Sequence, residues 1–343
     1  MKVLYAFVVG AILLATSIVT LIRGLDASLS IPDQICYTDH EYTVNQEDKA
    51  DVGPTLTSRE KMQNTNLEFI PVNKHIPSDN IIKSVEFPDS YSCPILEIDV
   101  FRLRQLADGG AGVTVAVLDT GIDKNHNDLI GKVKGEINLT NSLTARDIDG
   151  HGTHVAGIIA ADNTHGVMGI SPGINLLNVK IADDQGRFDS LTLEQGIIWA
   201  VKNDANVINL SVEIAEYTER LEKVINYAWE NGVLIISAAG NNKANSPVFP
   251  AYYESTIAVT ALRGGDSLAP LANYGDWVDI AAPGFEVYST LPQNNYGYKT
   301  GTSFSTAYVS GVAALLYNAI VDKNEDSLLN DEVRQEIVTG WPN

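Results

Sequence analysis

The chain is short of positive charge. Its 343 residues include 23 Lys and Arg but 43 Asp and Glu, so the formal net charge is −20. An excess of negative charge of this size favours solubility and disfavours nucleic acid as a partner. It also suits calcium binding or a saline habitat. The hydrophobic content of 45% in a chain of this length predicts one large core with additional segments.

Several motifs of other protein classes are missing. No repeat or low-complexity tract stands out. The glycine-rich run 109–112 precedes a strand-like stretch, whereas a dinucleotide-binding loop follows its strand. His151 and His154 have no Glu between them and no third ligand nearby, which argues against a zinc site. We expect His154 to be a packing residue.

Three short segments, far apart in the chain, each carry a residue suited to one role in acyl transfer. They are Val-Leu-Asp-Thr-Gly around Asp119, Asp-Gly-His-Gly-Thr-His around His151 and Gly-Thr-Ser-Phe-Ser around Ser303. A serine hydroxyl needs an adjacent base, histidine can supply it, and a carboxylate can hold the imidazole in one tautomer. Each residue also has a structural alternative: a turn cap, a structural histidine and a helix N-cap, respectively.

The surroundings of these residues favour a reactive site. Asp119 ends the apolar run Val113–Leu118, which predicts a buried parallel strand, and sites form beyond the carboxyl ends of such strands. Glycines on both sides of His151 allow another segment to approach closely. Ser303 opens a predicted helix of small and apolar residues, where backbone N–H groups and the helix dipole assist a nucleophile.

A fourth segment carries a candidate oxyanion donor. Val233–Ser237 predicts another buried strand, and residues 238–241 follow it as Ala-Ala-Gly-Asn. The amide of Asn241 is suited to donate to a developing oxyanion together with the backbone N–H of Ser303. An Asn in a Gly-Asn turn is the structural alternative.

The chain order Asp119, His151, Ser303 is the subtilisin order, one of three in which this triad is known. On these residues and Asn241, the chain resembles the subtilisin-like serine proteases (subtilases, peptidase S8) over residues 98–340. An α/β-hydrolase esterase is excluded because its order is Ser, Asp, His and because Gly-x-Ser-x-Gly is absent. Acid-acting relatives with Glu and Asp in place of the His–Asn pair are also disfavoured.

The resemblance implies an exported serine endopeptidase that cuts polypeptides through an acyl-enzyme. Ser303 would attack, His151 would move the proton, Asp119 would orient His151, and Asn241 would stabilise the tetrahedral intermediate. The alternative is a catalytically silent subtilase-fold protein that binds peptides at the membrane surface. The four intact positions favour the enzyme.

Strand-like and helix-like stretches alternate from Ala111 to Val338. This alternation predicts an α/β fold of three layers, with a mostly parallel central sheet and helices on both faces, as in the subtilisins. The expected strands are residues 113–118, 175–180, 207–210, 233–237, 257–260 and 278–281. The expected helices are residues 155–161, 191–203, 218–231, 304–317 and 331–338.

The N-terminal region predicts export. Val3–Ile22 is mostly apolar and is long enough for a signal peptide or a membrane anchor. We therefore expect residues 1–27 to be one of these, 28–95 to be a propeptide or N-terminal extension, and 96–343 to be the catalytic domain. The resemblance implies the propeptide by position only. We expect a secreted or membrane-anchored monomer whose catalytic domain lies outside the cytoplasm.

The two cysteines, Cys36 and Cys93, both precede the catalytic domain. In an exported protein an even pair predicts a disulfide, here closing a long loop, and two unpaired thiols are the alternative.

The resemblance also implies a calcium site. Asp128 and Asn163 align with side-chain ligands of the strong calcium site of subtilisins, and Ala161, His165 and Val167 align with carbonyl ligands. Ca²⁺ prefers oxygen ligands of these kinds. An ordinary Asx-rich surface loop is the alternative.

The substrate-binding residues implied by the resemblance depart from the family pattern. The walls of the pocket for the residue preceding the scissile bond would be Ser211, Val212, Glu213, Ala238, Ala239 and Gly240. Phe188 and Leu191 would line an apolar pocket further upstream, together with Val212. The family usually has a large apolar residue and then glycine after this serine, whereas this chain has Val-Glu. The side chain of Glu213 could narrow the pocket, favour a basic residue or point to solvent.

Overall fold

Seven parallel strands form the centre of the molecule. The computed structural model describes residues 84–86, 92–94, 99–264 and 267–339. The strand order is β4-β5-β3-β6-β7-β8-β9, and each neighbouring pair is parallel. The bounds are β3 Thr114–Asp119, β4 Val133–Asn138, β5 Asn175–Lys180, β6 Val207–Leu210, β7 Leu234–Ala238, β8 Thr256–Leu262 and β9 Ile280–Pro283.

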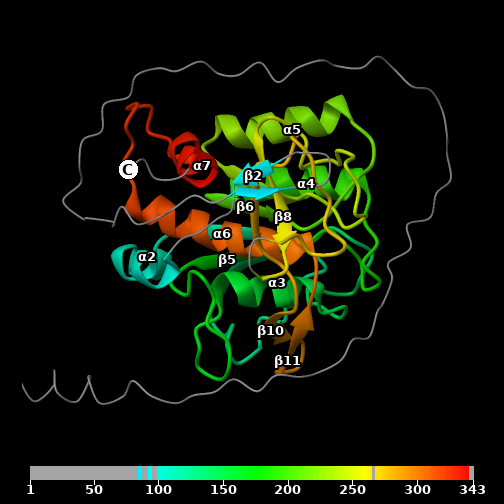
Figure 1. Cartoon of the computed structure of the whole chain (residues 1–343). Coiled ribbons are helices and arrows are strands. Elements are labelled where there is room, and N and C mark those ends of the chain that lie inside the picture. The colour runs from blue at the N-terminus through cyan, green and yellow to red at the C-terminus, as the bar shows by residue number, and fades with distance from the viewer. Residues whose placement is uncertain (1–83, 87–91, 95–98, 265–266, 340–343) are drawn as a thin grey trace, which may run out of the picture. The chain divides into compact units, whose positions relative to one another are not determined.

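Helices cover both faces of this sheet. Figure 1 shows α3 (His151–Ala160) and α6 (Thr302–Ala319) on one face, and α4 (Ser190–Lys202) and α5 (Glu219–Glu230) on the other. The predicted three-layer α/β fold with a parallel sheet is therefore confirmed.

The alternation of side chains along the strands divides the core between the two layers. In β3, Val115 and Val117 pack in the cluster formed with α3 and α6, whereas Ala116 and Leu118 pack in the cluster formed with α4 and α5. Successive strand residues point to opposite faces, so a strand covered on both sides must be apolar at almost every position.

The helix α6 is enclosed along most of its length. Fifteen of its 18 residues are buried, because it packs on β6 to β9 and is covered by other helices, including α3. By contrast, α5 buries only Leu221, Ile225 and Ala228 and turns its charged side chains outward. The first residues of α6 are therefore fixed by the core of the domain.

Several elements of the fold were not expected from the sequence. The edge strand β4 and the hairpin of β10 (Val287–Leu291) and β11 (Asn295–Lys299) were not expected. Their residues are polar or only partly buried, so they lack a clear apolar pattern. The other unpredicted elements are α2 (Val100–Leu106), the short 3₁₀ helix Asp108–Gly110, and the hairpin of β1 (Ser84–Glu86) and β2 (Ser92–Pro94). The C-terminal helix, α7 (Asn330–Thr339), was expected.

Some predictions concern residues outside the described ranges. Val3–Ile22 and Cys36 lie there, so neither the export segment nor the disulfide is tested, and the division at residues 27 and 95 stays a prediction. Within the described ranges, no helix is long and apolar enough to cross a membrane.

Candidate active site

Asp119 and His151 form a direct pair at the end of β3, an inner strand of the sheet. The Nδ1 atom of His151 lies 2.8 Å from Oδ1 and 3.0 Å from Oδ2 of Asp119. The carboxylate is only 2% exposed, and the backbone N–H of Thr120 donates to its Oδ1 at 2.7 Å. Because the carboxylate accepts at Nδ1, that nitrogen carries the proton and Nε2 of a neutral His151 is left as an acceptor.

The glycine after His151 allows this close approach. A Cβ atom on Gly152 would lie 2.1 Å from the carbonyl oxygen of Gly121 and 3.0 Å from Oδ1 of Asp119. Since any side chain would push α3 away from β3, the glycine predicted to permit close approach is required by the packing.

Two opposing effects act on the pKa of His151. Burial favours the neutral ring, but the charge of Asp119 and its hydrogen bond outweigh burial, so the pKa of His151 is raised above its ordinary value. Lys299 acts to lower this pKa and Asp149 acts to raise it. The imidazolium form is thus stabilised, as a group that accepts a proton during a reaction requires.

Ser303 and Asn241 meet at the N-terminus of α6. Ser303 is the second residue of that helix and is 7% exposed. The backbone N–H of Thr302 donates to Oδ1 of Asn241 at 2.9 Å, and the Thr302 hydroxyl donates at 3.1 Å. Because Oδ1 is held in this way, the Nδ2 amide group of Asn241 remains as a donor.

The histidine and the serine are brought together through the residue that follows the serine. The rings of His151 and Phe304 lie 5.5 Å apart. No hydrogen bond joins Ser303 Oγ to His151 among the described residues. Such bonds are often long without substrate and tighten in the complex.

The predicted substrate-binding segments leave the sheet side by side. Leu210 and Ser237 are in register at the ends of the neighbouring strands β6 and β7. Beyond them, the hydroxyl of Ser211 donates to the carbonyl oxygen of Ser303 at 3.2 Å, and Gly240 donates its N–H to the Thr302 hydroxyl at 3.2 Å. Both segments are therefore tied to the start of α6.

The remaining predicted binding residues differ in exposure. Ala238 and Ala239 are buried, whereas Val212 and Glu213 are half-buried. Phe188 is half-buried in the loop before α4, and Leu191 in the first turn of α4 is 46% exposed.

Comparison with known proteins decides the family. Residues 110–341 match the family model described as the subtilase family, peptidase S8. This chain belongs to the subtilase family. The fold and the resemblance expected from the sequence are thereby confirmed, and membership supports a serine-type endopeptidase.

Individual relatives agree with this assignment. The subtilase is 43% identical over 232 residues to a thermophilic serine proteinase of Bacillus sp. strain AK1, a match that covers 67% of this chain and 56% of that protein. It is 40% identical over 210 residues to thermitase of Thermoactinomyces vulgaris, covering 60% and 75% of the two chains. It is 36% identical over 232 residues to subtilisin DY of Bacillus licheniformis, covering 66% and 83%.

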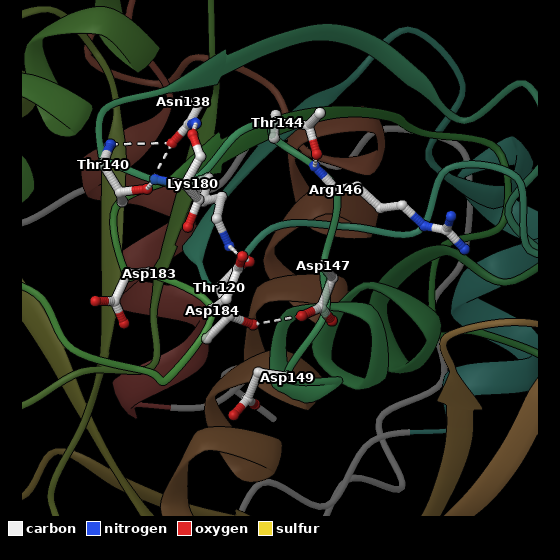
Figure 2. A network of polar contacts seen from close by, with 12 residues as sticks. Thr120, Asn138, Thr140, Thr144, Arg146, Asp147, Asp149, Lys180, Asp183 and Asp184 are labelled. Carbon is white, nitrogen blue, oxygen red and sulfur yellow. Dashed lines mark hydrogen bonds and ion pairs between the residues drawn. The ribbon is translucent and has the colours of Figure 1, made fainter.

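A buried carboxylate that the sequence analysis missed supports the Asp119–His151 pair of this subtilase. Asp147 is fully buried, and its Oδ1 accepts hydrogen bonds from the Thr120 hydroxyl at 2.9 Å and from the Gly150 N–H at 2.8 Å. Its Oδ2 accepts from both the N–H and the hydroxyl of Thr153, at 2.8 and 2.6 Å. Figure 2 shows Asp147 facing Thr120. The position of Asp147, three residues before Gly150 at the start of a helix, was the signal available in the sequence.

This carboxylate links the start of α3 to the end of β3. The Thr120 hydroxyl that donates to Asp147 also accepts the N–H of Gly152 at 3.0 Å. The positive end of the α3 dipole stabilises the negative charge. Asp147 thus holds the two segments that carry Asp119 and His151.

A buried lysine lies beneath the same turn. Lys180 is in register with Asp119 on the neighbouring strand β5 and is fully buried. Its Nζ donates to the carbonyl oxygen of Thr120 and forms an ion pair with Asp184 at 3.0 Å (Figure 2). A cation at this position offsets part of the negative charge that Asp119 and Asp147 bring into the core.

Asp128, expected to bind calcium, accepts hydrogen bonds from neighbouring segments. The N–H of His165 donates to Asp128 Oδ1 at 2.6 Å, and Oδ2 accepts the Val167 N–H at 3.1 Å and the Tyr296 hydroxyl at 2.8 Å. Three hydrogen-bond donors therefore satisfy this buried carboxylate. No group of three or more His, Cys, Asp and Glu within the described ranges could hold a metal ion.

The other predicted ligands are engaged in backbone hydrogen bonds. The Ala161 carbonyl accepts the Gly169 N–H at 2.8 Å, and the Val167 carbonyl accepts the Asn163 N–H at 2.8 Å. These carbonyls therefore take part in the hydrogen bonds of the loop, and the calcium site stays a prediction. Burial acts to raise the pKa of Asp128, but the hydrogen bonds from Tyr296, His165 and Val167 outweigh it and lower that pKa.

His154 is a packing residue, as expected. It is fully buried, its Nε2 donates to the Gly297 carbonyl at 3.1 Å, and its ring lies 4.7 Å from that of Phe304. Burial lowers the pKa of His154 to about 3, so the ring is neutral.

Replacing Asp147 with Asn should lower the free energy of unfolding by about 2 kcal/mol, because an amide cannot accept from donors at both of its ends. Asp149→Asn is the matched control, since among the described residues the Asp149 side chain accepts only the His151 N–H, at 3.0 Å. Urea denaturation of the two variants measures the difference. Equal stability of the two variants would show that Asp147 does not hold the segments together.

Tyr296→Phe should lower the free energy of unfolding at pH 7 by about 1.5–3 kcal/mol, since the ionised Asp128 loses a donor. The folded pKa of Asp128 is lowered, so its stabilisation is complete above the unfolded value of about 3.9 and is lost as the pH falls through the folded pKa. The variant and the parent should therefore converge at low pH.

Tyr298→Phe is the control, because Tyr298 lies on the same strand and is 69% exposed. Calorimetric scans at pH 7 and at successively lower pH measure the effect. Equal stability of the two variants at pH 7 would show that the Tyr296 hydroxyl does not stabilise Asp128.

Proposed function

We propose that this subtilase is an exported serine endopeptidase that hydrolyses peptide bonds through an acyl-enzyme. The proposal rests on two groups of residues that are arranged for acyl transfer. One is the hydrogen-bonded Asp119–His151 pair, and the other is Ser303 at the N-terminus of α6 beside an amide donor from Asn241. Substrates would be polypeptides, because the segments beyond β6 and β7 flank this site.

Each residue has a physical role in the proposed reaction. Ser303 Oγ attacks the scissile carbonyl carbon while His151 Nε2 takes its proton, and the imidazolium is stabilised by Asp119. The developing oxyanion receives hydrogen bonds from Asn241 Nδ2 and from the Ser303 N–H. His151 then gives the proton to the leaving amine, and water attacks the acyl-enzyme with His151 again as base.

The segments before the catalytic domain would serve in maturation and export. Residues 28–95 would act as a propeptide that the enzyme removes, and the apolar run Val3–Ile22 would direct export, either as a cleaved signal or as an anchor. The enzyme would then act outside the cytoplasm as a monomer. Such an enzyme requires an intact site, whereas a peptide-binding protein of the same fold does not.

The first test compares the full chain with its Ser303→Ala and Asn241→Asp variants. The parent should react with a fluorophosphonate probe and cleave casein, and Ser303→Ala should do neither because it lacks the nucleophile. Asn241→Asp keeps the oxygen that Thr302 requires but replaces the Nδ2 donor with an anion. Its kcat should fall by about 10²–10³-fold or more, a range that the donor's removal from subtilisin, a relative, has established.

Mass spectrometry of the labelled chain identifies the modified residue and any shortening of the N-terminus. Circular dichroism of each variant controls for folding. A folded parent that neither reacts nor cleaves would favour the silent peptide-binding protein over the enzyme.

The pH dependence of kcat/KM offers a separate test of His151. Activity requires the neutral ring, and the pKa of His151 is raised from 6.5, so the acid limb should have its midpoint above 6.5. Lys299→Met should shift the limb to higher pH, because Lys299 lowers this pKa, and Asp149→Asn should shift it to lower pH. Shifts in the same direction would contradict the assignment of the limb to His151.

A further inference from the structure

Glu213 is the side chain that most changes the expected substrate pocket. It stands where the resemblance implies glycine, and the sequence left three orientations open. In the structure the side chain does not extend into solvent. Its Oε1 lies 3.2 Å from Nδ2 of Asn242, from which it accepts a hydrogen bond.

The second carboxylate oxygen fixes the position of the group more closely. A Cβ atom built on Gly240 would lie only 2.3 Å from Oε2 of Glu213. The carboxylate therefore crosses from the segment after β6 to the segment after β7. It lies against both neighbours of Asn241, the residue whose Oδ1 is bound to Thr302.

This position places the Glu213 carboxylate near the site of the scissile carbonyl. In the proposed function, the scissile carbonyl lies between Ser303 Oγ and Asn241 Nδ2. The residue that contributes this carbonyl has its Cα one bond away, so its side chain starts next to Asn241. A carboxylate that flanks Asn241 at Gly240 and Asn242 is within reach of a long side chain on that residue.

One oxygen of this carboxylate also lacks a hydrogen-bond partner. Oε2 of Glu213 is buried and has no hydrogen-bond partner, and no Lys or Arg among the described residues forms an ion pair with Glu213. A carboxylate oxygen removed from water without a donor is unfavourable, and a bound cation or hydrogen-bond donor relieves the cost. Lys and Arg side chains carry such donors at the end of a flexible apolar stem.

We propose that Glu213 selects peptide substrates with Lys or Arg immediately before the scissile bond, as the counter-ion of that side chain. The proposal deepens the proposed function and rests on it. Selection by charge differs from a simple narrowing of the pocket by Glu213, which would favour small residues such as Ala. It also excludes efficient cleavage after Asp or Glu, because two like charges would meet in a partly dry site.

The test uses the full chain and a set of peptides that differ only in the residue before the cut. Lys, Arg, norleucine, Ala and Glu are compared by kcat/KM, since norleucine has the length of Lys without its charge. The parent should cleave after Lys or Arg about 10- to 100-fold faster than after norleucine, because binding without the cation leaves a polar group unpaired. This ratio should decrease as the ionic strength rises.

Glu213→Gln should abolish most of the preference for Lys over norleucine. The matched control is Glu216→Gln, which removes an exposed carboxylate three residues further along the chain and should keep the ratio of the parent. Equal cleavage after Lys and norleucine by the parent would overturn the proposal. So would a preference for Ala, or an equal loss on all peptides in Glu213→Gln.

A second measurement separates this proposal from the proposed function. Peptidyl diphenyl phosphonates with a Lys-like or a norleucine side chain react with the nucleophile without needing turnover. Faster inactivation by the Lys-like compound, lost in Glu213→Gln, supports the proposal even where peptide turnover is slow. Reaction of Ser303 with both compounds at equal rates overturns the role of Glu213 alone, whereas no reaction of the folded parent with any phosphonate overturns the enzyme itself and this proposal with it.

Discussion

The site depends on the fact that parallel strands all end at the same edge of the sheet. β3, β6 and β7 are consecutive neighbours in space, so Asp119, Ser211 and Ala239 leave the sheet together although the chain separates them widely. The helices α3 and α6 pack on one face and bring His151 and Ser303 to this edge with their first residues. The sheet therefore fixes the distances between groups that no local segment could bring together.

Buried negative charge is the cost of this arrangement, and backbone donors offset it. Asp119, Asp128 and Asp147 are at most 2% exposed. Each accepts hydrogen bonds from backbone N–H groups of nearby segments, at Thr120, at His165 and Val167, and at Gly150 and Thr153, respectively. These carboxylates act as connections between segments, since an ionised oxygen can accept several donors at once.

The sequence predicted the parts of the molecule that have a local pattern. The buried strands β3, β5, β6 and β7 were expected within one residue at each end, because strands covered on both faces must be apolar throughout. β4 was not predicted because it lies at the edge of the sheet and none of its residues is fully buried. The four proposed catalytic residues were visible because each follows or begins an apolar element.

Long-range contacts account for what the sequence did not show. The role of Asp147 depends on Thr120, 27 residues away, and that of Asp128 depends on Tyr296, 168 residues away. Likewise, nothing local indicated that the side chain of Glu213 would lie against Gly240 and Asn242, because that contact exists only when β6 and β7 pair. The pairing of strands, and not the composition of any segment, decides these contacts.

The enclosure of α6 in the core has a consequence for how such an enzyme would lose activity. A helix buried along 15 of its 18 residues cannot shift its first turn while the rest of the domain stays intact. The proposed nucleophile is therefore either held in place or part of an unfolded chain that has no site at all. Self-digestion then needs two different molecules, one folded to cut and one unfolded to be cut. Its rate would follow the product of their concentrations, so dilution would protect the enzyme and concentration would shorten its life.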